Sequence, residues 1–282
     1  MIIVVDGGAT KSDWRLVNPD QTLVKQLILS GTNVSAMSLD AIREVIAKAS
    51  EEFKAYQKEI SGIYFYTAGV ITEEIDSELR KALSAISRDA EIDCQTDLIG
   101  AARAACGHEP GISAILGTGS NSCFFDGKEI TKRVYSAGFI LGDEGSGAAL
   151  GKLFIADFLK GFVPKPIAEE FALKFPSDYP TIVQNVYHSS SSPSGYLGSF
   201  APFILSHYNN PYIRQLVNDN FRSFINRSLR QYDIAKYPVG IVGGFGYANR
   251  DIFSALAAEA GIRISRFIKE PIEGLIIYHT EK

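Results

Sequence analysis

Short apolar runs recur along the chain and alternate with longer segments whose apolar residues return every third or fourth position. The runs at residues 2–5, 62–68 and 112–116 are nearly unbroken, a pattern typical of strands buried on both faces of a sheet. Residues 13–17 and 122–125 each follow a Gly-rich turn, and we interpret them as the hairpin partners of the first and third runs. The pattern therefore predicts central strands that enter tight turns.

The longer segments have the spacing of amphipathic helices. Helices are predicted over residues 39–56, 73–87 and 98–106, and short strands over 27–29 and 91–94. The resulting order is three strands followed by alternating helices and strands. This order is typical of a mixed sheet with helices packed on it.

The second half of the chain repeats part of this pattern. A Gly-rich segment at 137–147 leads into a helix predicted over 148–159, and the chain is mainly helical from there to the next strand. That strand is predicted over 239–242 and is followed by a helix over 249–260. A short helical run at 272–279 ends the chain. Two related halves are therefore expected, and the length of 282 residues accommodates two modest domains.

Composition narrows the class of protein. With 46% hydrophobic and 21% charged residues and a net charge of -4, the chain has the balance of an ordinary soluble globular protein, and nothing indicates a nucleic acid or membrane partner. Three cysteines without a CxxC pair and four scattered histidines indicate neither a disulfide framework nor a zinc site. No apolar segment reaches the roughly 20 residues of a membrane span, and the chain begins directly as a strand, so a cytoplasmic location is expected.

Three glycine turns carry the candidate chemistry. Asp6-Gly7-Gly8 closes the first apolar run, Gly117-Thr118-Gly119 closes the third, and Gly243-Gly244 closes the strand at 239–242. Backbone N–H groups lie bare in such turns and can hold phosphate, although a hairpin needs glycine whether or not it binds anything. The spacing of a P-loop and that of the dinucleotide GxGxxG motif are both absent.

Together with the segment Leu-Gly-Asp-Glu-Gly-Ser-Gly at 141–147, these turns resemble the sugar kinase, heat-shock chaperone and actin superfamily over nearly the whole chain. Within it, the chain is most similar to the N-acetylglucosamine kinase branch of the BadF/BadG/BcrA/BcrD ATPase family. The resemblance implies an α/β protein of two ribonuclease-H-like (actin-like ATPase) domains, with mixed sheets flanked by helices and an ATP cleft between them. A Gly/Pro-rich boundary near 107–111 places the domains at 1–107 and 108–270, with the last helix, 271–282, packing back on the first.

The resemblance also implies roles for individual residues. Asp6 would help to hold the Mg²⁺ of MgATP, and Asp97 would be the general base that accepts the proton of the sugar hydroxyl. The residues expected at the nucleotide are Gly8, Thr10, Lys11, Thr118, Gly119, Gly243 and Gly244. The residues expected at the sugar are Asn33, Ser120, Asn121, Gly138 and Asp143.

Each carboxylate or amide also has a purely structural interpretation. Asp6 could cap its turn, and Asp97 opens a predicted helix, where an N-cap is the simplest interpretation from the residues alone. Asn33 and Asp143 could equally be turn or cap residues. A carboxylate that takes the hydroxyl proton is nevertheless what phosphoryl transfer to a sugar requires.

The expected activity is ATP- and Mg²⁺-dependent phosphorylation of N-acetylglucosamine or a related amino sugar at the 6-hydroxyl, and a homodimer is compatible with the resemblance. One alternative is an activator-type ATPase of the dehydratase and benzoyl-CoA reductase family, and another is a non-catalytic nucleotide or sugar sensor. The positions of Cys94, Cys106 and Cys123 differ from the cluster-binding cysteines of such activators. Where the branch carries Gly-Trp-Gly, this chain has Ser136-Ala137-Gly138, which leaves the identity of the sugar open.

Overall fold

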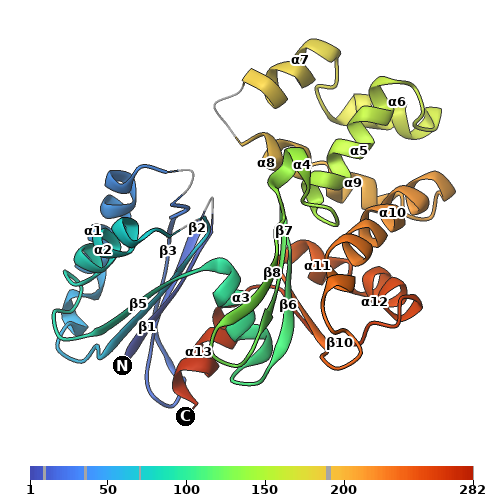
Figure 1. The fold of residues 1–282 in the computed structure, drawn as a ribbon. Helices are drawn as coiled ribbons and strands as arrows, with labels where there is room; N and C mark the ends of the chain where they lie inside the picture. Colours follow the sequence, from blue (N-terminus) through green and yellow to red (C-terminus); the bar gives the residue numbers. More distant parts are fainter. Residues whose placement is uncertain (9–10, 35–36, 70, 189–191, 282) are drawn as a thin grey trace. The chain divides into compact units, whose positions relative to one another are not determined.

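The strands expected from the apolar runs form two mixed sheets, one in each of two units (Figure 1). The first unit comprises residues 1–109, 126–130 and 270–282, and the second comprises 110–125 and 131–269. The computed structural model describes residues 1–8, 11–34, 37–69, 71–188 and 192–281. Each sheet has helices packed on it, which confirms the predicted α/β class.

In the part of the first unit that the structure describes, five strands form the sheet in the order β3-β2-β1-β4-β5. Their bounds are Ile2–Gly7 (β1), Lys11–Val17 (β2), Leu23–Ser30 (β3), Gly62–Thr67 (β4) and Glu91–Thr96 (β5). β1 pairs antiparallel with β2 and parallel with β4, so the first run is central and buried as its apolar character predicts.

Helices cover both faces of this sheet (Figure 1). Their bounds are Leu39–Phe53 (α1), Glu73–Leu83 (α2), Asp97–Cys106 (α3) and Ile272–Thr280 (α13). One face buries Trp14 and Phe65 in a core with α1 and α2. On the other face α13 lies against α3, where a Cβ at Gly274 would stand 2.9 Å from Cα of Ala104, so only glycine permits this approach.

Two helices are shorter than their apolar spacing predicts. The helix expected over 39–56 ends at Phe53 and continues as a 3₁₀ turn, Lys54–Tyr56. The helix expected over 73–87 ends at Leu83, and Ile86 N–H then bonds the carbonyl of Leu83, three residues back. Such tighter turns keep side chains such as Ile86 buried after the α-helix has ended.

The described part of the second unit repeats the strand arrangement of the first. Its five strands run β10-β9-β6-β7-β8, so β6 takes the central place of β1 and β9 that of β4. The bounds are Gly111–Leu116 (β6), Ser120–Phe125 (β7), Ile130–Val134 (β8), Val239–Val242 (β9) and Ile264–Ile268 (β10). The same order and strand directions around the centre support a duplicated fold.

The helices of the second unit enclose a separate aromatic core. Their bounds are Gly138–Leu141 (α4), Gly147–Leu159 (α5), Lys165–Lys174 (α6), Tyr179–Val183 (α7), Pro193–Gly198 (α8), Ala201–Ser206 (α9), Pro211–Arg227 (α10), Gly244–Ala248 (α11) and Arg250–Glu259 (α12), with a π-helical turn Gln184–His188 and a 3₁₀ turn Leu229–Gln231. Phe154 and Phe171 meet edge to face at 5.0 Å in this core, and Phe221 and Phe253 do so at 5.4 Å. None of the helices described is long and apolar enough to cross a membrane.

Candidate functional site

The first glycine turn is held by its neighbours in the first unit. A side chain at Gly7 would collide with Oγ1 of Thr32 and would lie 2.8 Å from the carbonyl oxygen of Tyr66. The carbonyl of Gly8 accepts the N–H of Thr32 at 3.0 Å, and that of Gly7 accepts the N–H of Ala68 at 3.0 Å. The turn therefore packs against residues 31–33 and the end of β4, which leaves room only for glycine. Thr10 lies outside the described residues.

Asp6 is the acidic residue near the end of β1, opposite Asp13 of β2. Loss of hydration inside the protein, followed by the negative charge of Asp97, raises the pKa of Asp6 to about 7. This value includes smaller contributions from Asp13 and Glu270, which raise the pKa, and from Lys11, which lowers it. The carboxylates of Asp6 and Asp97 thus lie near enough within this unit to repel each other.

Lys11 is engaged by a carboxylate that sequence analysis does not identify. Its Nζ donates to Oε1 of Glu270 at 2.9 Å, and both side chains are largely exposed. Four positions along β2, Arg15 pairs with Asp13 at 3.0 Å and with Glu273. Two carboxylates at the start of α13 therefore bind two cations of β2.

Asp97 is the first residue of α3, directly after β5. The N-cap of α3 is Thr96, whose Oγ1 accepts the N–H of Ile99 at 3.4 Å. The capping interpretation of Asp97 is therefore wrong, because its neighbour performs that task. A negative charge in the first helical turn is also favourable to the helix dipole.

Asn33 follows the turn that packs on Gly7. The carbonyl of Thr32 accepts Oγ1 of Thr67 at 2.5 Å, and the carbonyl of Asn33 accepts the N–H of Met37 at 3.0 Å. Asn33 is half-buried. The predicted sugar turn and the predicted phosphate turn are thus joined through Thr32 in the first unit.

The second hairpin, between β6 and β7, is tied to the start of α5 in the second unit. The N–H of Gly147 donates to the carbonyl of Gly117 at 3.0 Å, and that of Ala148 donates to the carbonyl of Thr118 at 3.0 Å. Oγ of Ser146 caps the helix by accepting the N–H of Ala149 at 3.1 Å. The first amides of α5 are therefore used to fix the hairpin.

Asp143 and Ser120 are brought together in the same unit. Oδ1 of Asp143 accepts the N–H of Ser120 at 3.3 Å, and the N–H of Asp143 donates to the carbonyl of Ser136 at 2.9 Å. Asp143 has a φ of 57°, a left-handed conformation that is uncommon for any residue except glycine. Burial raises the pKa of this carboxyl above its ordinary value.

Asn121 and Gly138 are the other two residues of the second unit that are predicted to lie at the sugar. Oδ1 of Asn121 accepts the N–H of Ser122 at 3.0 Å. Gly138 has a φ of 70° and nothing within 4 Å of the place where a Cβ would stand. Its left-handed backbone explains the glycine there.

The two glycines after β9 are unlike each other. Gly243 has a φ of 118°, and a Cβ there would stand 2.6 Å from the carbonyl oxygen of Leu116. Gly244, the first residue of α11, has nothing within 4 Å of its Cβ position. The fold therefore requires glycine at 243, whereas nothing in the described chain requires it at 244.

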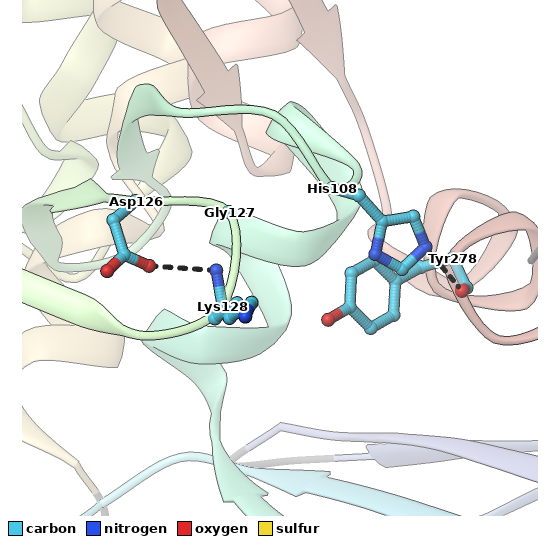
Figure 2. A pocket seen from close by; sticks show the side chains of 5 residues that line it. All are labelled: His108, Asp126, Gly127, Lys128 and Tyr278. Atoms are coloured by element: carbon cyan, nitrogen blue, oxygen red, sulfur yellow. Dashed lines mark hydrogen bonds between the residues drawn. The ribbon is translucent and has the colours of Figure 1, made fainter.

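Two hollows within single units are lined, among the described residues, by none of the predicted site residues. One in the first unit, of about 510 Å³, is lined by His108, Asp126, Gly127, Lys128 and Tyr278 (Figure 2). There the His108 ring stacks on Tyr278 at 4.2 Å, and Asp126 accepts the N–H of Lys128 at 2.8 Å. A second hollow, of about 640 Å³, lies in the second unit beside α5 and α7 and is mainly apolar. Neither hollow is therefore lined by a residue that the sequence assigns to the nucleotide or the sugar.

Comparison with known proteins places the chain in a family. The model of the BadF/BadG/BcrA/BcrD ATPase family matches residues 4–159, which include both the first and the second glycine turns. The chain belongs to this family. The predicted resemblance is thereby confirmed.

Individual relatives agree with this placement. The crystal structure of a candidate N-acetylglucosamine kinase from Porphyromonas gingivalis is 34% identical and superposes with a TM-score of 0.93, covering 100% of this chain and 99% of the other. A second candidate N-acetylglucosamine kinase, from Chromobacterium violaceum, shares the fold with a TM-score of 0.76 at 19% identity, covering 98% of each chain. An N-acetylmuramic acid/N-acetylglucosamine kinase from Clostridium acetobutylicum is 26% identical over 166 residues, 57% of this chain. The match spans about half, 54%, of that curated relative.

Proposed function

We propose that this chain is an ATP-dependent carbohydrate kinase that phosphorylates N-acetylglucosamine or a related amino sugar at its 6-hydroxyl. The observation that carries the proposal is the position of the Asp97 carboxylate relative to α3 and to Asp6. Asp97 stands at the start of a helix that Thr96 already caps, and its charge acts on Asp6 in the same unit. Two such carboxylates suit a reaction in which one carboxylate holds the metal ion and the other accepts the proton of the acceptor hydroxyl.

In this proposal Asp97 accepts the proton of the sugar hydroxyl as its oxygen attacks the terminal phosphorus of ATP. The glycine turns would contribute backbone N–H groups, and Lys11 would contribute a positive charge at the phosphates. Gly244 supports a nucleotide nearby, because its glycine serves no need of the described chain itself. Family membership implies ATP as the nucleotide.

The proposal includes Mg²⁺ as the partner of ATP. When bound, the ion would neutralise charge on the phosphate oxygens. Asp6 would hold it, directly or through water, and the repulsion that raises the pKa of Asp6 would be relieved by a nearby cation. No group of three or more metal-binding side chains gathers among the described residues. Mg²⁺ fits this setting, since it commonly keeps several waters and uses one or two carboxylates plus substrate phosphates.

The sugar would be recognised by neutral amides, hydroxyls and one carboxylate, which suit an array of sugar hydroxyls. We assign this role to Asn33 of the first unit and to Ser120, Asn121, Gly138 and Asp143 of the second. The amino-sugar preference is supported by the names of the relatives.

The test is a coupled ADP-release assay across amino sugars, hexoses and anhydro sugars. N-acetylglucosamine should stimulate ADP release strongly over the rate without acceptor, and its 6-deoxy analogue should compete without being phosphorylated. If only a different sugar stimulates release, the kinase assignment stands and the substrate is wrong. If ATP is bound but no sugar is phosphorylated, the chain is a sensor rather than a kinase.

The activator-type alternative is disfavoured by the cysteines. Cys94 lies buried in β5, where loss of hydration raises the pKa of its thiol to about 12, far from the thiolate that binds iron. Cys123 is buried within β7, and Cys106 lies at the far end of α3 from Asp97. Iron in anaerobically purified protein, at a stoichiometric level, would overturn this assignment.

A further inference from the structure

One face of α10 follows the backbone of the segment that carries Asp143. Asn220, Phe224 and Arg227 stand at positions i, i+4 and i+7 of α10 and therefore share a face. All three contact residues 144–146, which directly follow Asp143. We propose that α10 holds this segment in place and that Asn220 is a positioning residue for sugar binding by Asp143. The inference rests on the proposed function.

Asn220 makes the central contact. Its side chain is only 2% exposed, its Oδ1 accepts the N–H of Gly145 at 3.0 Å, and its Nδ2 donates to the carbonyl of Ser146 at 3.1 Å. The two backbone partners fix the orientation of the amide, because one needs an acceptor and the other a donor. A primary amide offers both groups side by side, and a carboxylate offers only acceptors.

Phe224 and Arg227 of the same face lie against Gly145 and Glu144. Gly145 has a φ of 79°, and a Cβ there would lie 2.6 Å from Cβ of Phe224. The segment thus approaches α10 too closely for any residue but glycine. Nε of Arg227 lies 2.6 Å from Oε1 of Glu144, but Arg227 is mostly exposed, so this ion pair contributes little. On this face of α10, the buried side-chain amide of Asn220 is therefore the group that fixes the backbone of residues 145 and 146.

The contact of Asn220 with Gly145 and Ser146, called the clamp below, acts on Asp143 through the turn from Asp143 to Ser146. The N–H of Ser146 donates to the carbonyl of Asp143 at 3.1 Å, and the carbonyl of the same Ser146 is held by Asn220. Asp143 itself adopts a left-handed conformation that persists only where the surroundings enforce it. Loss of the clamp would let Asp143 return to negative φ, which would turn its carboxylate away from Ser120.

The experiment compares two identical substitutions on one helix. Asn220→Asp removes the donor to Ser146 and places a charge against a carbonyl. Asn218→Asp is the matched control, because Oδ1 of Asn218 only accepts the hydroxyl of Tyr208 at 2.9 Å, and a carboxylate can do the same. Asn220→Ser is the milder second variant, in case the buried charge prevents folding. Folding is checked by circular dichroism and thermal melting.

We expect Asn220→Asp, or Asn220→Ser if that alone folds, to raise the KM for N-acetylglucosamine at least tenfold, with the Kd for ATP changed less than twofold. Asn218→Asp should change neither constant more than twofold. A merely structural role would lower kcat through a smaller active fraction and leave both constants unchanged, which would overturn the inference. Equal shifts in the sugar and ATP constants would also overturn it. A wild-type protein that binds ATP but phosphorylates no sugar would instead overturn the proposed function.

Discussion

At the start of α3, the proposed catalytic role of Asp97 and the capping role of Thr96 can be tested separately. The helix that Asp97 begins is capped by Thr96, whose Oγ1 accepts the N–H of Ile99, so the N-cap position is not that of Asp97. We therefore expect Asp97→Asn to lower kcat by roughly 10²- to 10⁴-fold with ATP affinity nearly unchanged. Thr96→Ala should do the reverse, costing about 1 kcal/mol of stability with kcat retained. Turnover and thermal melting of both variants check this, and a Thr96 variant as inactive as the Asp97 variant would contradict it.

The two glycines after β9 permit a similar separation. Gly243→Ala should cost several kcal/mol of stability, because the added Cβ meets the carbonyl of Leu116 at a positive φ. Gly244→Val should leave the melting temperature nearly unchanged, since its side chain would enter open space, yet weaken ATP binding. Calorimetric titration with ATP checks this. Unchanged affinity in Gly244→Val would move the adenosine site elsewhere.

Single functional residues can be predicted from sequence where the neighbouring residues mark their position. Asp6 and the glycine turns stand at the ends of apolar runs, where position itself suggests a role. Asn220 is not marked in this way, because it is one polar residue in an amphipathic helix and its partners lie about 75 residues away. Glu270 pairs with Lys11 across 259 residues and is equally invisible in sequence. Only the fold brings these side chains to their partners.

Among the elements, the pair formed by β2 and α13 bears on nucleotide binding. Lys11 is held by Glu270, the first residue of the segment that returns to the first unit. A phosphate that recruits Lys11 must compete with this carboxylate, and an exposed ion pair of this kind is worth about 0.2–1 kcal/mol. Glu270→Gln should therefore tighten ATP binding by about 1.4- to 5-fold.

The control for this variant is Glu273→Gln, which removes the same charge from the same end of α13. Its partner is Arg15 rather than Lys11, so ATP affinity should stay within error of wild type. Equal tightening in both variants would show a general effect of charge instead of competition for Lys11. Weaker binding in Glu270→Gln would show that the carboxylate assists the nucleotide, contrary to the expectation.

Elements were predictable where an apolar pattern marks them. The central strands β1, β4, β6 and β9 are such elements, and they were found from sequence. β8 and β10 were not found, because both lie at sheet edges and carry exposed charged residues that break the apolar run. An edge strand needs only one paired neighbour, so its sequence is less constrained.

For the molecule as a whole, the end of the chain contributes to the stability of the first unit. His279 of α13 stacks on the ring of Tyr64 at 3.5 Å, and its Nε2 lies 2.7 Å from the hydroxyl of Tyr66. Arg103 donates to that same hydroxyl at 2.7 Å, so the Tyr66 oxygen accepts from Arg103 and its proton can be donated to Nε2. His279 thus joins α13 to two tyrosines of β4.

Burial and, after it, the positive charge of Arg103 lower the pKa of His279 to about 3. Asp93 acts in the opposite direction, and His108 adds to the lowering. In the unfolded chain the histidine has its ordinary pKa near 6.5. Between pH 6.5 and pH 3 the unfolded state therefore binds more protons, and the first unit loses stability as the pH falls, by at most about 1.4 kcal/mol per pH unit from this group.

Unfolding in urea followed by tryptophan fluorescence can isolate this effect. Trp14 is the single tryptophan of the chain and is fully buried in the first unit, so it reports on the unit that contains His279. His279→Phe keeps a ring against Tyr64 but cannot titrate, so it should be less stable at pH 7.5 and lose less stability than wild type on going to pH 4.5. Groups elsewhere titrate alike in both proteins and cancel in the difference. Parallel pH dependence in the two proteins would show that His279 is not held neutral in the folded chain.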